Sequence, residues 1–317
     1  MNILFWLLLL LLSAAGSLFV GVSSLGPLDL LYGTAEQKQV FWLSRVPRLL
    51  SILMAGAGLA VAGLVMQQLT QNKFVSPTTA GTMDAARLGM LVSILFLAGA
   101  PIIVRAGVSA AFALAGTLVF MFLLERIREK DPIFIPLVGL MFGSIIGSVT
   151  TFFAYRYDVI QNMTAWMQGN FAAVMSGNYE LLWAVIPLTA AVYVYADRLT
   201  LAGMGESFSK NVGLSYRTVV NTGLVLTALL TALIMLTVGM IPFLGLIVPN
   251  LVTIFRGDHL RRNLPYTALA GAGFVLFCDV LGRILIYPYE IPIGMTVGVI
   301  GSGVFLYLLW RGNRYGF

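Results

Sequence analysis

Stretches of apolar residues cover almost the whole chain and are broken at short intervals by charged residues, proline and glycine. Because a helix that crosses the hydrocarbon core of a bilayer needs about 20 mostly apolar residues, each long stretch predicts one spanning helix. The pattern predicts about ten of them, at residues 3–23, 48–70, 87–104, 107–124, 133–155, 180–196, 218–239, 241–254, 266–287 and 294–310. The eighth is too short to cross unless it continues from the seventh through Pro242, so a half-helix is expected there.

Composition agrees with a polytopic, all-α membrane protein whose residues 1–317 form a single transmembrane domain. Hydrophobic residues make up 59% of the chain and charged residues only 10%, and the mean hydropathy of +0.92 lies outside the range of soluble domains. The first apolar stretch lacks a basic leading segment and a small-residue cleavage site, so it is expected to stay as the first helix. The single Cys278 and single His259 exclude a disulfide framework and a histidine metal site.

The basic residues predict the orientation of the helices. Lys and Arg gather in the cytoplasmic loops of membrane proteins, so the net charge of +6 does not indicate a nucleic-acid partner. Ten spans place both termini on one side. With cytoplasmic termini, thirteen of the nineteen basic residues lie inside: Lys73, Arg87, Arg126, Arg128, Lys130, Arg198, Lys210, Arg217, Arg256, Arg261, Arg262, Arg311 and Arg314. Six lie outside: Lys38, Arg45, Arg48, Arg105, Arg156 and Arg283.

Ionisable residues within the predicted spans are few. Asp279 and Arg283 stand four residues apart in the ninth span, where they can pair on one helix face. They form either a structural ion pair or, with Asp279 as the coupling carboxylate, part of a transporter driven by protons or sodium.

An enzyme is not expected. The glycine-rich phosphate-binding pattern that ends in Lys and Ser or Thr is absent, since Gly203, Gly205 and Lys210 have the wrong spacing. No Ser/His/Asp or Cys/His arrangement can be assembled, so no catalytic residue is assigned. No cofactor or metal site is expected either, and any energy from ATP must come from a partner.

Small residues recur at helical spacing in two spans. Gly139, Gly143 and Gly147 stand four apart in the fifth span, and Gly56 with Ala60 and Gly58 with Ala62 do the same in the second. Such spacing lets helix backbones approach closely in lipid. Alternatively, these small residues line the path through which a bulky substrate passes.

The loop between the sixth and seventh spans predicts a short amphipathic helix. Glu206 favours a helix N-terminus, Phe208 and Val212 share one face, and Gly213 is suited to the C-terminal stop. This helix either lies on the lipid surface or fits a groove in a soluble partner.

Several ordered motifs resemble the iron-siderophore and cobalamin permease family of ABC importers over nearly the whole chain. The second span carries Arg45-Val46-Pro47-Arg48, the stretch from Ala55 to Ala60, and Gln67. The strongest motif runs from Ile241 to Asn250. Further matching segments follow: Arg256-Gly257-Asp258-His259, Leu264-Pro265, Cys278-Asp279 to Arg283, Glu290-Ile291-Pro292-Ile293-Gly294 and Gly301.

The resemblance implies a type II ABC importer permease fold in a bacterial cell (inner) membrane. Its implied partners are two cytoplasmic ATPase subunits, an external siderophore-binding protein, a second permease chain that is identical or related, and a ferric-siderophore substrate. The implied ATPase-coupling segment contains Gly205, Glu206, Ser207, Phe208, Lys210, Gly213 and Leu214. The implied docking residues for the binding protein are Arg45, Arg48 and Arg283, for which lipid anchoring is the alternative. The translocation path is expected to include Gln67, Gly139, Gly143, Gly147, Asn162 and Gln168.

One segment departs from the usual family pattern. The family has Asn-Pro-Leu after its second helix, where this chain reads Asn72-Lys73-Phe74 and continues to Asp84, and it often has His where Asn250 stands. The segment from Lys73 to Asp84 resembles the branch that serves catecholate siderophores of the petrobactin or vibriobactin type. A secondary transporter leaves the amphipathic loop and the external arginines unexplained, and a membrane scaffold predicts no ordered motifs.

Overall fold

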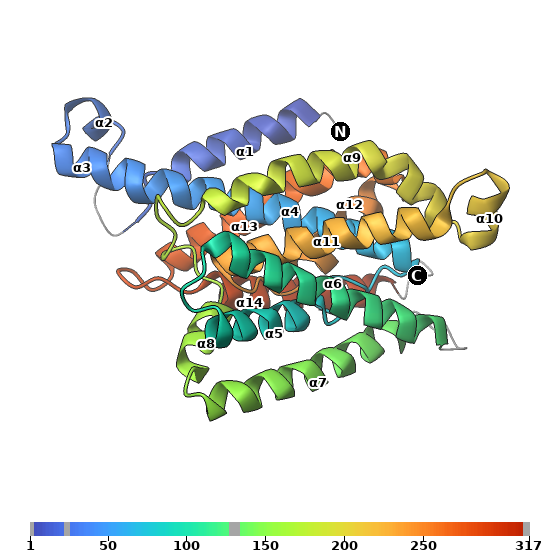
Figure 1. Cartoon of the computed structure of the whole chain (residues 1–317). Helices are drawn as coiled ribbons and strands as arrows, with labels where there is room; N and C mark the ends of the chain where they lie inside the picture. The colour runs from blue at the N-terminus through green and yellow to red at the C-terminus, as the bar shows by residue number, and fades with distance from the viewer. Residues whose placement is uncertain (1–2, 22–25, 127–133, 313–317) are drawn as a thin grey trace.

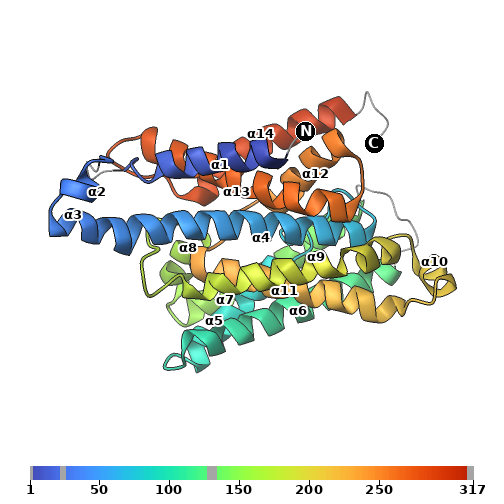
Figure 2. The same cartoon turned by 90° about the horizontal axis from the view of Figure 1, so that it is seen from above.

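The structure, a computed structural model, describes residues 3–21, 26–126 and 134–312. Within these ranges the chain is helical and contains no strand, which confirms the all-α prediction. Figures 1 and 2 show an elongated bundle in which α2 and α3 lie at one end and α10 at the other. The longer helices are α1 (Ile3–Ser17), α4 (Val46–Thr70), α5 (Thr82–Phe96), α6 (Ile102–Arg126), α7 (Phe134–Arg156), α9 (Val185–Ala202), α11 (Tyr216–Val238), α12 (Leu244–Arg256), α13 (Leu260–Ile284) and α14 (Ile293–Gly312). Shorter pieces are α2 (Asp29–Tyr32), α3 (Ala35–Val40), a π-helical turn η1 (Phe41–Arg45), α8 (Ile160–Met167), a 3-10 turn η2 (Glu180–Ala184) and α10 (Glu206–Asn211).

Helix α4 forms the centre of the bundle and packs against α13, α11 and α12. Small residues allow this packing, because a side chain on Gly56 would begin 2.6 Å from the carbonyl oxygen of Gly271 and 2.8 Å from the Cα of Ala272. In lipid the hydrophobic effect does not drive helices together, so close packing of their backbones provides the attraction instead. The packing interpretation of the small residues in the second span is therefore confirmed.

Among the described residues, six helical segments are long and apolar enough to cross a membrane, and α1, α12 and part of α14 (Ile293–Leu308) are shorter apolar helices. The six are Ala35–Thr70, Ile102–Arg126, Phe134–Arg156, Glu180–Ala202, Tyr216–Val238 and Leu260–Ile284. The count of ten complete crossings stays a prediction. The first described turn of α1 and the last of α14 lie at the same end of the bundle as α10 (Figures 1 and 2).

The predicted third span, residues 87–104, is wrong. Helix α5 begins at Thr82 and ends at Phe96, and a turn precedes α6 at Ile102. Pro101 explains the break, because proline lacks the amide donor of a helix interior and disfavours helical geometry in the residue before it. Arg87 therefore lies within α5 and not in a loop. Three other basic residues that we placed inside, Arg128, Lys130 and Arg314, lie outside the described residues.

The expected half-helix is present as α12, which spans Leu244–Arg256. It does not continue α11, because the chain turns between Gly239, with φ of 93°, and Phe243, with φ of 61°. Its first turn packs on α4, where Gly245 lies directly against Gly63. A short helix entering the bundle in this way brings its N-terminal end into the interior.

Candidate functional site

Three arginines and two carboxylates meet at the α3 end of the bundle, and we call them the arginine cluster: Arg45, Arg48, Asp279, Arg283 and Glu290. Nη2 of Arg48 lies 2.8 Å from Oδ1 of Asp279, and its Nη1 lies 2.7 Å from Oε2 of Glu290. Nη2 of Arg283 lies 2.7 Å from Oδ2 of Asp279, so the predicted pair within the ninth span is confirmed. Asp279 is thus held between two guanidinium groups.

Backbone carbonyls at and after the end of α1 accept further hydrogen bonds from the cluster. Nη1 of Arg283 donates to the carbonyls of Ser17 at 2.9 Å and Val20 at 2.7 Å, and Nη1 of Arg45 donates to that of Leu18 at 2.7 Å. All three carbonyls belong to the end of α1 and the segment after it, so the cluster ties this segment to η1 and α13. Arginine suits this task because its planar group presents five donors in fixed directions.

Four members of the arginine cluster, Arg45, Arg48, Arg283 and Glu290, line a cavity of about 340 Å³. Three guanidinium groups stand against two carboxylates in the cluster as a whole, so the cavity carries an excess of positive charge. Arg45 and Arg283 are 9% and 6% exposed, which means that an approaching acidic group would have to enter the cavity to reach them. Both carboxylate oxygens of Asp279 face arginine, which supports a structural ion pair over the alternative of a proton-coupling carboxylate.

The predicted amphipathic helix is present at the opposite end as α10. Its C-terminus has the hydrogen bonds of a Schellman motif: the amide of Leu214 donates to the carbonyl of Ser209 at 2.9 Å, and that of Gly213 to Lys210 at 3.0 Å. Gly213 has φ of 79°, a conformation that favours glycine. Lys210 forms an ion pair with Glu206 at 2.9 Å, and this contact lowers the pKa of the Glu206 carboxyl.

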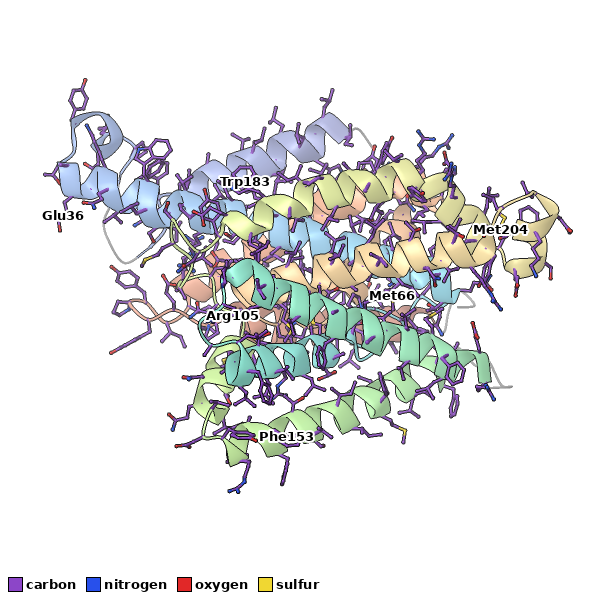
Figure 3. All side chains as sticks on the ribbon, in the orientation of Figure 1. Glu36, Met66, Arg105, Phe153, Trp183 and Met204 are labelled. Carbon is purple, nitrogen blue, oxygen red and sulfur yellow. The ribbon has the colours of Figure 1, made fainter. Side chains whose placement is uncertain are left out.

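One side of α10 is apolar and faces away from the bundle. Phe208 is 44% exposed and Val212 is 53% exposed, and Met204 just before the helix projects outward in Figure 3. Ser209 points the other way, is fully buried, and donates to the carbonyl of Leu201 in α9 at 3.0 Å. The helix is therefore fixed to α9 by its polar side and leaves an apolar side uncovered by the described parts of the chain.

A second cavity, of about 360 Å³, lies among the end of α4, Gly203 after α9, and residues of α12 and α13. Amide side chains dominate it. Nε2 of Gln71 donates to the carbonyl of Gly203, and Nε2 of Gln68 to that of Thr200 at 3.5 Å. The end of α4 is thus bonded directly to the end of α9, from which α10 follows.

The residues expected along the translocation path are spread over the length of the bundle. Gln67 is buried near the α10 end, where its Nε2 donates to the carbonyl of Leu246 at 3.3 Å. Gly139 and Gly143 are buried halfway along α7, and Gly147 is partly buried. Asn162 in α8 and Gln168 just after it are exposed. Helix α8 lies at the other end of the bundle from α10 and Gln67 (Figure 1). The structure does not bring these six residues into one site.

The sequence analysis missed two oppositely charged residues in α5. Asp84 and Arg87 are three residues apart and both are partly buried within the bundle. We missed them because the third span was started at residue 87, which placed Arg87 at a helix end. Two opposite charges directly after Gly81 and before an apolar stretch were the signal that could have revealed them.

An all-helical bundle with a buried ion cluster at one end and an exposed amphipathic helix at the other belongs to a polytopic membrane permease. The model of the FecCD transport family matches residues 7–311, and the chain belongs to this family. It is 56% identical to the petrobactin import system permease protein YclN of Bacillus subtilis, over 99% of this chain and 100% of that protein. It is 39% identical to the ferric-anguibactin transport system permease protein FatD of Vibrio anguillarum, over 86% of each chain. Among solved structures, a metal-chelate type ABC transporter in an inward-facing conformation matches with a TM-score of 0.83 and 25% identity, over 98% of each chain.

Proposed function

We propose that this chain, as a single transmembrane domain, is the permease subunit of an ABC importer that moves an iron(III)-siderophore complex, of the catecholate class, into the cytoplasm. The observation that carries the proposal is the 56% identity with a petrobactin permease along 99% of the chain. The segment from Lys73 to Asp84, which resembles the catecholate branch, supports the finer choice of substrate.

ATP hydrolysis on two cytoplasmic ATPase subunits drives the transport, and α10 is the part of this chain that they contact. The exposed apolar side of α10, formed by Met204, Phe208 and Val212, supports a fit to a groove in a soluble partner. Gln71 and Gln68 then transmit movement of this segment to α4. In this orientation both termini and α10 are cytoplasmic, in the inner membrane of a bacterium.

An external siderophore-binding protein delivers the substrate at the α3 end, where its carboxylates enter the cavity of the arginine cluster. The excess positive charge of the cavity supports this docking. Arg45→Glu is the variant of choice, because it leaves the pairs of Asp279 with Arg48 and Arg283 intact. It should weaken binding-protein affinity most at low salt, and an acidic-to-basic change on the binding protein should restore part of the loss. Unchanged affinity at low salt would exclude docking for Arg45 and leave its hydrogen bond to the carbonyl of Leu18 as its role.

A second permease chain, identical or related, covers α7 and completes the path. Within the described residues α7 packs mainly on α5. Its large side chains Met141 and Ile145 are exposed, as is Phe153, which is labelled in Figure 3. The path is then expected between the two chains, alongside α7, whose Gly139 and Gly143 pack on the α5 side. A cysteine at Asn162, in a variant without Cys278, should react with a water-soluble thiol reagent in at least one transport state; complete protection in every state would contradict its place on the path.

The test of the function is uptake of radiolabelled iron by cells that lack their own siderophore permeases. Cells with this permease, its binding protein and its ATPase should accumulate iron from a ferric catecholate chelate, and cells with an ATPase unable to hydrolyse ATP should not. A flux that persists without active ATPase and stops with a protonophore would instead identify a secondary transporter. Uptake of ferric hydroxamates alone would contradict the catecholate assignment.

A further inference from the structure

Asp84 and Arg87 both face α7 across the α5–α7 contact. Oδ2 of Asp84 lies 2.5 Å from where a side chain on Gly143 would begin, and Oδ1 lies 3.8 Å from the same point on Gly147. Nη2 of Arg87 donates to Oγ1 of Thr151 at 3.4 Å. Since Gly143, Gly147 and Thr151 recur every four residues, they lie on one side of α7. The glycines therefore leave room for charged groups, in addition to bringing backbones together.

Hydrogen bonds between α5 and α6 indicate how deep in the bilayer Asp84 and Arg87 lie. The hydroxyl of Ser109 donates to the carbonyl of Ala86 at 2.9 Å, and the hydroxyl oxygens of Thr82 and Thr117 lie 2.8 Å apart. Ser109 stands at the start of the third turn of a 25-residue helix, roughly 10 Å from its first residue at 1.5 Å per residue. Arg87 thus lies at the depth of the hydrocarbon core, where ionisable groups are costly and serve function.

The guanidinium group of Arg87 has spare donors. No ion pair joins it to a carboxylate among the described residues, and its buried Nε has no hydrogen-bond partner there. Its one bond, to Thr151, is long. The neighbouring side of α7 carries the exposed Ser144 and Ser148, whose hydroxyls donate to the carbonyls of Leu140 and Ser144 in the same helix at 2.8 Å.

We propose that Arg87 contacts the anionic oxygen donors of the iron(III) chelate during its passage and selects for negative charge. This inference rests on the proposed function. Catecholate oxygens bound to iron(III) leave a complex with net negative charge, and the planar guanidinium group binds such oxygens through paired donors. Asp84, one turn away, keeps the local charge near zero, so the chelate is attracted without being retained, as transport requires.

Transport kinetics in proteoliposomes with the second permease chain, the ATPase and the loaded binding protein test this role. Arg87→Gln should lower the maximal rate of ferric catecholate uptake about tenfold, the loss expected for one charge-assisted contact. The half-saturating concentration of binding protein should stay unchanged, because docking takes place elsewhere. Arg87→Lys keeps the charge but loses the planar group, so an intermediate rate is expected; a rate equal to that of the wild type would overturn the proposal.

Two matched variants separate substrate contact from helix packing. Thr151→Val removes the only side chain that accepts a hydrogen bond from Arg87 among the described residues, and Arg105→Gln removes an arginine that bonds only to the carbonyl of Ala98 there. Both should transport at a rate within about twofold of the wild type. A loss in Thr151→Val equal to that in Arg87→Gln would show that Arg87 only holds α5 to α7. Wild-type protein that fails to take up the chelate would contradict the proposed function, whereas normal uptake by Arg87→Gln would contradict this inference alone.

Discussion

The arginine cluster and the Asp84–Arg87 pair both place guanidinium groups among membrane helices, but they satisfy these groups differently. In the cluster, Arg48 binds two carboxylates and Arg283 binds one carboxylate and two carbonyls. Arg87 has a single long bond to a hydroxyl. Guanidinium groups that carboxylates bind within the chain hold helices together, and a guanidinium group that no carboxylate binds is available to a ligand. The difference predicts opposite responses to mutation.

The largest effect is expected where the cluster loses its shared carboxylate. Asp279→Ala leaves Arg48 and Arg283 without their common partner, which should lower the free energy of unfolding by about 3–5 kcal/mol, as for other broken buried pairs. Thermal unfolding in detergent measures this loss. Glu290→Gln is the control, since the Glu290 side chain is 24% exposed and should contribute only about 1 kcal/mol. Equal stability of Asp279→Ala and the wild type would remove the distinction between the two regions.

An intermediate effect is expected at the glycines that face Asp84. A methyl group on Gly143 would meet Oδ2 of Asp84 at 2.5 Å and the Cα of Gly81 at 3.3 Å, whereas on Gly147 it would meet only Oδ1 of Asp84 at 3.8 Å. Gly143→Ala should therefore lower stability by about 1–3 kcal/mol, and Gly147→Ala by less than about 0.5 kcal/mol. The difference in Tm between these two variants checks the position of the carboxylate, and a reversed order would place it elsewhere.

The smallest effect on stability is expected at Arg87. Because its side chain contributes one long hydrogen bond, Arg87→Gln should change the free energy of unfolding by less than about 1 kcal/mol, while uptake falls. The changes in Tm of Arg87→Gln and of Asp279→Ala, each relative to the wild type, compare the stability contributions of the two regions. A loss as large as that in Asp279→Ala would make Arg87 a structural residue like those of the cluster.

Local features of the sequence predicted local features of the structure. Asp279 and Arg283 stand four residues apart in one helix, and Gly213 ends α10, so neither required knowledge of the tertiary fold. The half-helix α12 followed from the length of its apolar stretch. These are interactions within one or two turns, where spacing determines contact.

Contacts between distant segments could not be predicted in the same way. Arg48 binds Asp279 and Glu290 from positions more than 200 residues apart, and nothing in the spacing reveals which arginine binds which carboxylate. Asp84 and Arg87 were missed because the apolar stretch begins only after them, so hydropathy alone started the span at residue 87, whereas α5 begins at Thr82.

Transport by this chain should be driven by ATP hydrolysed on a partner that binds α10. Proteoliposomes containing the complete transporter allow radiolabelled iron uptake and phosphate release to be measured in the same vesicles, for the wild type and for Glu206→Lys, which breaks the exposed pair with Lys210. We expect uptake only in the presence of ATP, and a lower ratio of iron transported to ATP hydrolysed in the variant. Uptake that needs no ATP and follows an imposed proton gradient, with the same rate in both proteins, would contradict the account.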